Sequence, residues 1–334
     1  MGTVTIVVVP RERFSYSQRS LENIYANTRP PFSLVYVDGG SPTRLRHYLE
    51  RTAKERGFKL IRREHYLSPN QARNLGADGV STDYVVFIDN DAVVEPGWLQ
   101  KLLACADETG AWIVGPIYCI GDPARQVVHM AGGDARIVEE GGKRIFREQH
   151  RFGGKRLPEL GADFQRGETE LAEFHCMLIR TSALKRLGPF DEGLLCSREH
   201  IDVCMLAREA GGRVFVEPES VVSYVPPPPF ALSDIPFYLL RWSDEWGFAT
   251  MRHFHRKWRL DNPDDELIGD WIRAHRRVLF ERTRKTSIRL FGWRLGNLIC
   301  NATVKTVEAI VMPFAMRRSS RSFPAGSNPA KLDA

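Results

Sequence analysis

The 334-residue chain contains few cysteines, and they follow neither a metal-binding nor a disulfide pattern. Its six cysteines include no CxxC pair and show no even spacing, which argues against both a zinc site and a disulfide framework. We therefore expect reduced, mostly buried thiols, as in a cytoplasmic protein.

The chain also lacks the sequence features of a secreted or membrane-spanning protein. The apolar run near the N-terminus is too short for a signal peptide and has no basic region before it. No stretch of about 18 consecutive apolar residues predicts a transmembrane helix. We predict a cytoplasmic protein whose membrane contact, if it has one, is peripheral and on the inner face.

Positive charge exceeds negative charge, but unevenly along the chain. The formal net charge is +6, and Arg and Lys crowd residues 252–294 and 317–321. This pattern indicates either an anionic surface or substrate for the C-terminal part, or a solvated basic face. We do not expect nucleic acid as a partner.

The first 116 residues alternate between strand-like and helix-like patterns. Strands are predicted at 3–9, 32–38, 58–63, 83–89 and 111–116, with helical periods at 15–28, 42–56, 70–80 and 96–109. Repeated strand–helix–strand units predict an α/β fold with a mainly parallel, Rossmann-like sheet flanked by helices. Ligands of such sheets bind beyond the carboxyl ends of the strands.

The remaining chain divides into three predicted parts. In residues 117–230, glycine pairs predict a hairpin and a long loop. They are followed by a predicted strand at 171–180 and a helix capped by Thr181 or Ser182. A helix from Ser197 to 210 and two strands at 213–218 and 220–225 complete this part. Residues 231–316 predict a helical, aromatic and basic extension, and residues 317–334 a disordered tail.

The fourth predicted strand ends in Asp89-Asn90-Asp91, which has three interpretations. The side chains could cap a helix that starts at Pro96. One aspartate could be a phosphatase-type nucleophile, although such enzymes usually open their fold with that strand. The two carboxylates could also hold Mg²⁺ or Mn²⁺, because these ions prefer oxygen ligands and leave positions for a diphosphate.

Other polar residues follow the neighbouring strands at the same predicted edge. The first strand continues into Pro10-Arg11-Glu12, the second ends in Asp38-Gly39, and Arg73 comes near the start of a helix, where a guanidinium and the helix dipole favour phosphate. These positions suit a nucleoside diphosphate.

With these motifs in place, the sequence resembles the family 2 glycosyltransferases of the GT-A fold. The resemblance rests on VVVP, VDGGS, QARNLGAD, FIDND, GPFDE and REHIDVCMLAREAG in this order, and covers roughly residues 3–225. It implies a nucleoside-diphosphate-sugar donor (UDP, GDP or dTDP), a Mn²⁺ or Mg²⁺ ion at Asp89 and Asp91, and transfer with inversion. By position, Asp38 resembles the contact to the base, and Asp89 with Asp91 the contacts to ribose and metal.

The same resemblance places the general base in Glu199-His200-Ile201-Asp202, where the sequence departs from the family pattern. The family usually has Asp where this chain has His200. Imidazole suits proton removal near neutral pH, and a position in the first turn of a helix disfavours its protonation. His200 is therefore a candidate base, with Asp202 and Glu199 as alternatives.

A third metal ligand is less clearly indicated. Many relatives carry a histidine after the last strand, where this chain has Ser223-Tyr224-Val225. His129, His253 and His255 remain as candidates. Glu173 and His175, at the start of a strand, could face the acceptor or simply pack there.

The segment 286–316 mixes apolar residues with Arg and Lys. It could lie in a membrane interface, or contact a partner helix or a second copy of the chain.

The sequence as a whole predicts an inverting, metal-dependent glycosyltransferase whose acceptor is a hydroxyl of a glycan or lipid-linked glycan. Two alternatives stay open. One is nucleotidyl transfer to sugar phosphates, which would call for a glycine-rich loop after the first strand that Pro10-Arg11-Glu12-Arg13 does not provide. The other is a non-catalytic scaffold that binds nucleotide sugars.

Overall fold

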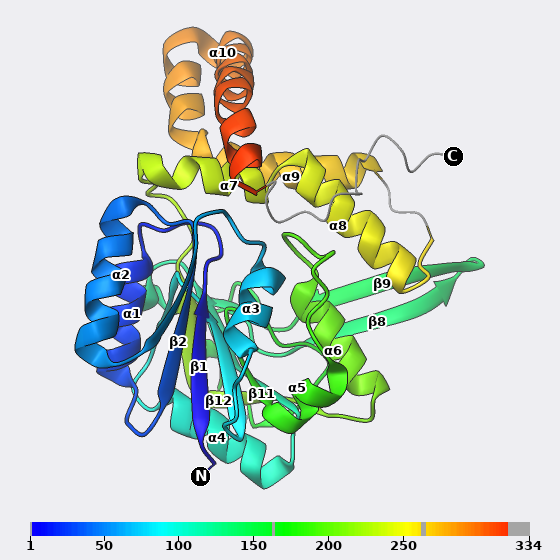
Figure 1. The fold of residues 1–334 in the computed structure, drawn as a ribbon. Helices are drawn as coiled ribbons and strands as arrows, with labels where there is room; N and C mark the ends of the chain where they lie inside the picture. Colours follow the sequence, from blue (N-terminus) through cyan, green and yellow to red (C-terminus); the bar gives the residue numbers. More distant parts are fainter. Residues whose placement is uncertain (1, 162–163, 262–264, 320–334) are drawn as a thin grey trace.

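A computed structural model describes residues 2–161, 164–261 and 265–319. It shows one large mixed sheet with helices on both faces, and a group of helices above one edge of that sheet (Figure 1). Residues 320–334, most of the predicted disordered tail, lie outside the described residues. Residues 317–319 belong to a helix, so the predicted start of the tail is wrong.

The N-terminal half of the sheet is parallel, as the sequence predicts. Strands β1 (Val4–Val9), β2 (Ser33–Gly39), β3 (Lys59–Arg63) and β4 (Tyr84–Asp89) lie in the order β4-β1-β2-β3. Helices α1 (Ser17–Asn27), α2 (Thr43–Arg56) and α3 (Pro69–Ala77) connect them, and α4 (Trp98–Thr109) follows the short strand β5 (Ala92–Val94). These parallel strands end at the same edge of the sheet.

The other half of the sheet contains an inserted antiparallel strand. Strand β11 (Cys176–Arg180) lies between β4 and β6 (Ile113–Ile120) and is antiparallel to both. Strand β12 (Val214–Tyr224) runs parallel to β6, and β10 (Gly167–Thr169) and β7 (Val128–Met130) add short edges. The two strands predicted at 213–218 and 220–225 are therefore one strand, interrupted by a bulge between Glu217 and Val221.

The predicted hairpin is present. Strands β8 (Gly133–Glu140) and β9 (Lys143–His150) pair antiparallel across a turn at Gly141 and Gly142, both with positive φ. Two short 3₁₀ turns, η1 (Pro123–Arg125) and η2 (Leu157–Leu160), flank the hairpin in the chain. The limit predicted at residue 116 falls inside β6, so the two predicted halves share one sheet.

The predicted helix caps in the second half are wrong. Helix α5 (Thr181–Leu187) begins after Arg180 and α6 (Glu199–Glu209) after Arg198, and neither start has a side-chain cap. Arg198 has φ 68°, an uncommon value for a residue with a side chain, and its guanidinium is bound by Glu148 of β9. A contact from the hairpin, rather than Ser197, accompanies the start of α6.

Packing of α3 onto the sheet depends on Gly76. A Cβ atom at this position would lie 2.2 Å from Cγ1 of Val7 and 3.1 Å from Cγ2 of Val37. Only glycine lets the helix approach β1 and β2 this closely. The same helix carries Arg73 toward the end of β4.

The predicted helical extension is confirmed. It consists of η3 (Leu232–Asp234), α7 (Ile235–Arg241), α8 (Asp244–Lys257), α9 (Asp265–Leu279) and α10 (Glu281–Ser319), which lie above the carboxyl edge of the parallel strands (Figure 1). Asp234 accepts hydrogen bonds from the amides of Phe14 and Ser15, and Arg318 donates to the carbonyl of Gly40. The extension thus contacts the loops that follow β1 and β2.

Helix α10 is two helices joined by a sharp reversal. Gly292 has φ 76° and ψ 170°, and Figure 1 shows the two legs side by side. A Cβ at Gly296 would lie 2.5 Å from the backbone of Ile288, so the legs pack backbone to backbone. Within the described residues, α10 is the one helix long and apolar enough to cross a membrane. Its most apolar window of 18 residues has a mean hydropathy of 1.3, and 11% of that window is buried.

All six cysteines are free and buried, as predicted.

Candidate active site

The ends of β1 and β4 meet at the carboxyl edge of the sheet. Val9 pairs with Asp89 in the parallel register, so Pro10-Arg11-Glu12 and Asp89-Asn90-Asp91 leave the sheet side by side. Helix α4 begins after Gly97, and β5 separates it from the aspartates. The two aspartates therefore do not cap that helix.

Asp89 is fully buried and held by three basic side chains. Its Oδ2 lies 3.1 Å from Nη1 of Arg11 and 3.1 Å from Nδ1 of His175, and its Oδ1 lies 3.5 Å from Nη2 of Arg73. Burial by itself would raise the pKa of Asp89, but Arg11, His175 and Arg73 outweigh burial and hold the pKa at about 2. The carboxylate is ionised at every physiological pH.

Asp91 is equally buried but has no such partners. Neither of its oxygens has a hydrogen-bond or ion-pair partner among the described residues. Burial and the nearby carboxylates of Asp89 and Glu12 raise the pKa of Asp91 well above its usual value, and Arg11 and Arg13 only partly oppose them. An unpartnered buried carboxylate beside other carboxylates is the arrangement that a bound cation stabilises.

Asn90, between the two aspartates, holds the local backbone together. Its amide nitrogen donates to the carbonyl of Arg13 and the hydroxyl of Ser17, both at 2.8 Å, and its oxygen accepts from the amide of Arg11 at 3.0 Å. These bonds fix the loop after β1 against the loop after β4.

Arg73 lies in the second turn of α3, four residues after Pro69, rather than at the helix start. Its guanidinium lies 3.7 Å from the ring centroid of Phe174, and Nη1 donates to Asn70 at 3.0 Å. Burial lowers the pKa of Arg73 to about 10, with Asp89 opposing that shift, so the side chain is still a cation at neutral pH.

Asp38 organises the loop after β2. Its carboxylate accepts hydrogen bonds from the amide of Ser41 at 3.0 Å and the hydroxyl of Ser41 at 2.9 Å, and forms an ion pair with Arg62. Gly39 lies close to Leu67, since a Cβ there would be 3.1 Å from Cβ of that residue. Both sit at the edge where the sequence predicts the nucleobase.

A second row of side chains connects β1 to β11 through β12. The hydroxyl of Tyr224 donates to Glu12 at 2.7 Å, and the Tyr224 ring stacks on His175 with centroids 4.0 Å apart. Burial and Arg11 lower the pKa of His175 to about 4, so its imidazole is neutral at physiological pH. Tyr224 thus links Glu12 to His175, which lies beside Asp89.

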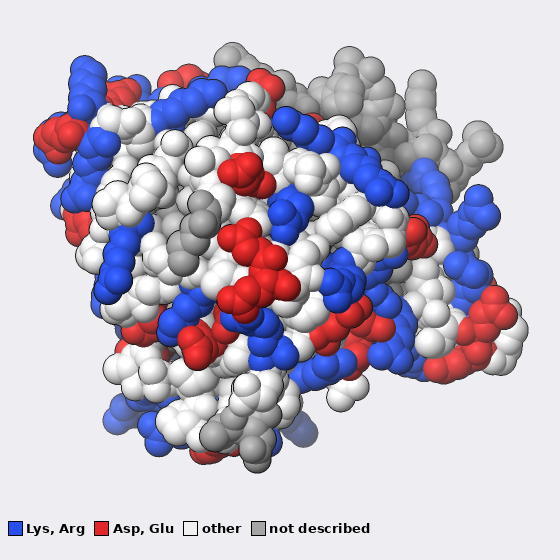
Figure 2. Space-filling model, turned by 90° about the horizontal axis from the view of Figure 1, so that it is seen from below, with Lys and Arg blue, Asp and Glu red and all other residues white. Residues whose placement is uncertain are grey.

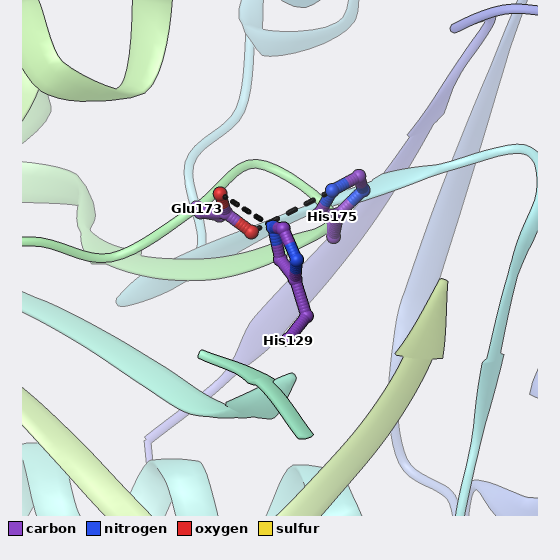
Figure 3. A group of neighbouring side chains, drawn as sticks. All are labelled: His129, Glu173 and His175. Atoms are coloured by element: carbon purple, nitrogen blue, oxygen red, sulfur yellow. Dashed lines mark hydrogen bonds and ion pairs between the residues drawn. The ribbon is translucent and has the colours of Figure 1, made fainter. Parts of the chain in front are cut away.

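His129, Glu173 and His175 form a cluster of neighbouring side chains next to Asp89 (Figure 3). Glu173 lies between the imidazoles: its Oε1 is 3.2 Å from Nε2 of His129, and its Oε2 is 3.5 Å from Nε2 of His175. One ligand atom from each residue lies within 4.8 Å of the others, so this group could hold a metal ion. His150, 3.8 Å from Glu173, extends the cluster.

The three candidate bases on α6 have different surroundings. Asp202 accepts hydrogen bonds from Nζ of Lys257 at 2.8 Å and Nε1 of Trp258 at 2.9 Å, which tie it to α8. Glu199 is buried and has one oxygen without a hydrogen bond.

His200, next to Glu199, has a free ring nitrogen, because Nε2 has no hydrogen-bond partner among the described residues. Burial lowers the pKa of His200, although Glu173, Glu148 and Glu199 oppose the shift. A neutral imidazole with a free nitrogen can accept a proton.

The other two histidines considered as metal ligands, His253 and His255, contact neither Asp89 nor Asp91. His253 lies 3.0 Å from both oxygens of Asp191, and His255 is 2.6 Å from the carbonyl of Asp261. His129 is the candidate that the structure brings to the cluster. No local sequence pattern predicts the contact of His175 with Asp89, because this contact depends on β11 pairing next to β4.

The predicted donor residues are covered rather than open to solvent. Asp38, Arg73, Asp89 and Asp91 are each at most 2% exposed, beneath loops that α7 and the end of α10 contact. A cavity of about 630 Å³ lies nearby between α1, α2 and η3, lined among others by Phe14, Tyr48 and Ser233. The predicted site residues do not line this cavity.

Comparison with known proteins relates this arrangement to a described family. The family described as "Glycosyl transferase family 2" matches residues 5–188. The "Pre-mycofactocin glycosyltransferase" of Mycobacterium tuberculosis is 25% identical over 167 residues, which are 50% of this chain and 32% of that protein. "Polypeptide N-acetylgalactosaminyltransferase 4" of Mus musculus is 24% identical over 320 residues, 90% of this chain and 52% of that protein.

Two solved structures share the fold. The structure described as GalNAc-T7 with UDP, GalNAc and Mn²⁺ matches with a TM-score of 0.55 at 16% identity, over 88% of this chain and 58% of that one. The structure of the mannosyltransferase PcManGT from Pyrobaculum calidifontis, in complex with GDP-Man and Mn²⁺, matches with a TM-score of 0.51 at 15% identity. The match covers 98% of this chain and 77% of that one. The chain spans about a third to a half of the curated relatives it matches.

Proposed function

The chain belongs to glycosyl transferase family 2 and has the predicted GT-A fold. We propose that it transfers a sugar from a nucleoside-diphosphate sugar to a hydroxyl of a glycan or lipid-linked glycan, with inversion, and that it requires Mn²⁺ or Mg²⁺. Asp91 carries this proposal, because a buried carboxylate without a protein partner at the end of β4 fits a cation.

We assign the metal to Asp91 together with Asp89. Asp91 offers two oxygens without partners, and Asp89 offers Oδ1, whose one near neighbour is Arg73 at 3.5 Å. Mn²⁺ is supported by two structures of the same fold that are described as holding this ion with a nucleotide or nucleotide sugar. When bound, the ion would offset the negative charge of the departing diphosphate.

Arg11 and Arg73 give the site positive charge independently of the metal. Arg73 is buried and Arg11 is partly buried beside Asp89, and both remain protonated at neutral pH. Their guanidinium groups can bind the oxygens of a diphosphate, for which a planar fork of donors is well suited. Asp38 and Gly39 would lie beside the nucleobase on the neighbouring strand.

We assign the general base to His200 rather than to Asp202 or Glu199. Lys257 and Trp258 already occupy both oxygens of Asp202, whereas Nε2 of His200 is free. In an inverting transfer the acceptor oxygen attacks the anomeric carbon as the bond to the diphosphate breaks. Nε2 of His200 takes the hydroxyl proton in that step, and Glu199 is placed to orient the acceptor.

The products distinguish this function from its alternatives. The purified chain is incubated, with Mn²⁺ or chelator, with UDP-, GDP- and dTDP-sugars and hydroxyl acceptors, and in a parallel reaction with nucleoside triphosphates and a sugar phosphate. A glycosyltransferase releases a nucleoside diphosphate, a nucleotidyltransferase releases pyrophosphate, and a scaffold releases neither. Release of pyrophosphate, or no product with any donor while a nucleotide still binds, would refute the proposal.

A matched pair of variants locates the metal. Asp91→Asn is expected to abolish stabilisation by Mn²⁺, whereas His129→Asn should leave it intact. The reverse result would move the ion to the cluster of His129, Glu173 and His175.

A further inference from the structure

The reversal of α10 exposes a short apolar tip. All seven residues from 289 to 295 are exposed, and we call them the hairpin tip. The exposed fractions are 67% for Leu290, 51% for Phe291, 71% for Trp293 and 49% for Leu295. The other six tryptophans of the chain are buried or half-buried. Large apolar side chains grouped on a projecting element mark an interaction site.

The tip stands on a packed base. The close approach of Gly296 to Ile288 and the burial of Cys300 hold the two legs together, and Glu308 forms an ion pair with Arg276 of α9 at 3.3 Å. Figure 1 shows the legs projecting away from the sheet. The exposed apolar side chains are thus displayed at the end of a defined structure.

The charges around the tip are all of one sign. Between residues 282 and 307 the sequence has six basic residues and no acidic one: Arg282, Arg284, Lys285, Arg289, Arg294 and Lys305. Arg284 and Lys285 pair with Glu281 at the start of the first leg, whereas Arg289 and Arg294, within the tip, form no ion pair among the described residues. The opposite face of the molecule differs, because Lys and Arg there lie interspersed with Asp and Glu (Figure 2).

We propose that the hairpin tip inserts into the interface of an anionic lipid bilayer. Aromatic side chains favour the headgroup region, and arginines beside them can reach the phosphates. The first leg, residues 281–291, is about 16 Å long at 1.5 Å per residue, about half the thickness of a hydrocarbon core. Because this short leg joins the tip to α9, the tip can enter one leaflet while α9 stays outside the membrane.

The same charges disfavour a second copy of the chain as the partner. A symmetric contact through the tip would bring Arg289 and Arg294 of one copy against the same residues of the other. Like charges facing each other weaken such a contact, whereas anionic headgroups strengthen binding. Binding of this kind needs neither donor nor acceptor, so it is independent of the proposed enzymatic function.

Co-sedimentation of the full chain with lipid vesicles tests this inference. Wild type is expected to sediment with vesicles of phosphatidylcholine mixed with phosphatidylglycerol, and much less with phosphatidylcholine alone. Replacing Phe291, Trp293 and Leu295 together with Ser should weaken binding by at least about 100-fold, since three large apolar side chains lose their burial. Arg289→Gln with Arg294→Gln should cost roughly 5-fold per charge on the anionic vesicles only.

Two controls separate the tip from the rest of the surface. Leu232→Ser removes another exposed apolar side chain, 86% exposed on η3, and should bind as wild type does. Trp293→Phe should keep binding but lose most of the fluorescence quenching by brominated lipid.

Two results would overturn the inference. One is wild type that stays in the supernatant with anionic vesicles. The other is a triple variant that still binds them. A dimer that ignores vesicles and dissociates on substitution of Trp293 would identify a second copy as the partner instead.

Discussion

Asp89 and Asp91 are two residues apart and equally buried, yet the structure predicts opposite effects on stability when each is changed to Asn. Asp91 has a raised pKa, so ionisation of its carboxyl group favours the unfolded state, and the free energy of unfolding falls as pH rises above the unfolded pKa of about 3.9. Asp89 has a lowered pKa, so its ionised form contributes stability above that pH, and this stability is lost as pH falls through about 2.

The magnitudes follow from what each carboxylate contacts. Asp91→Asn removes an unpartnered buried charge and keeps the shape, which should stabilise the metal-free protein by about 1–2 kcal/mol. Asp89→Asn leaves the buried Arg73 and the partly buried Arg11 without their anionic partner, at a cost of about 2–4 kcal/mol. At about 2–4 °C per kcal/mol, Tm should rise by about 2–8 °C in the first variant and fall by about 4–16 °C in the second.

Thermal unfolding in chelator and then in Mn²⁺ provides the assay. Mn²⁺ at 100 times its Kd should add about 2.7 kcal/mol of stability to wild type and none to Asp91→Asn. The variant is thus expected to be more stable than wild type without metal, less stable with it, and inactive. If Asp91→Asn unfolds earlier than wild type in chelator, or still responds fully to Mn²⁺, the reasoning about the unpartnered carboxylate is refuted.

Three further predictions concern α6 and α3. His200→Ala should lower kcat/KM by about 10²–10⁴-fold, and the acidic limb of the wild-type pH profile should have an apparent pKa below 6.5, because burial lowers the pKa of His200; an acidic limb that is unchanged in the variant would contradict this role. Asp202→Asn should destabilise the protein by about 1–3 kcal/mol in denaturant unfolding, since it weakens a largely buried pair with Lys257, while kcat of the folded enzyme stays within a few fold; a loss of kcat comparable to that of His200→Ala would make Asp202 the base. Gly76→Ala should destabilise by about 1–3 kcal/mol because its Cβ would meet Val7, and adding Val7→Ala should recover part of the loss; no loss in the single variant would show that α3 can shift.

The sequence predicted the parallel half of the sheet because its signals are local. Each strand is a short apolar run that ends in polar or glycine residues, and each is followed by a helical period. The same rule predicts that Arg11 and Asp89 lie at the same edge of the sheet, since the carboxyl ends of parallel strands share an edge. In the structure Nη1 of Arg11 lies 3.1 Å from Oδ2 of Asp89, a contact that the rule by itself does not specify.

Features that depend on distant contacts could not be predicted in this way. His175 reaches Asp89 because β11 inserts between β4 and β6, an order of strands that no local pattern encodes. The sequence predicts that α6 starts at Ser197, but Arg198 adopts the left-handed conformation and pairs with Glu148, about 50 residues earlier in the chain.

The reversal in α10 is a different case, because its signal was local. Gly292 interrupts the helical pattern of residues 286–316, and the chain reverses at this residue.

The direction of β11 has a consequence for how the site can vary. Because β4 and β11 are antiparallel neighbours, the chain runs through the site in opposite directions on the two strands. Asp89 lies at the end of β4, whereas Glu173 and His175 lie in the segment just before β11. Loops of different length can therefore be exchanged ahead of β11 while the register that fixes Asp89 is preserved. Sequence changes that alter the choice of acceptor can therefore accumulate in the segment before β11, while the end of β4 with Asp89 stays unchanged.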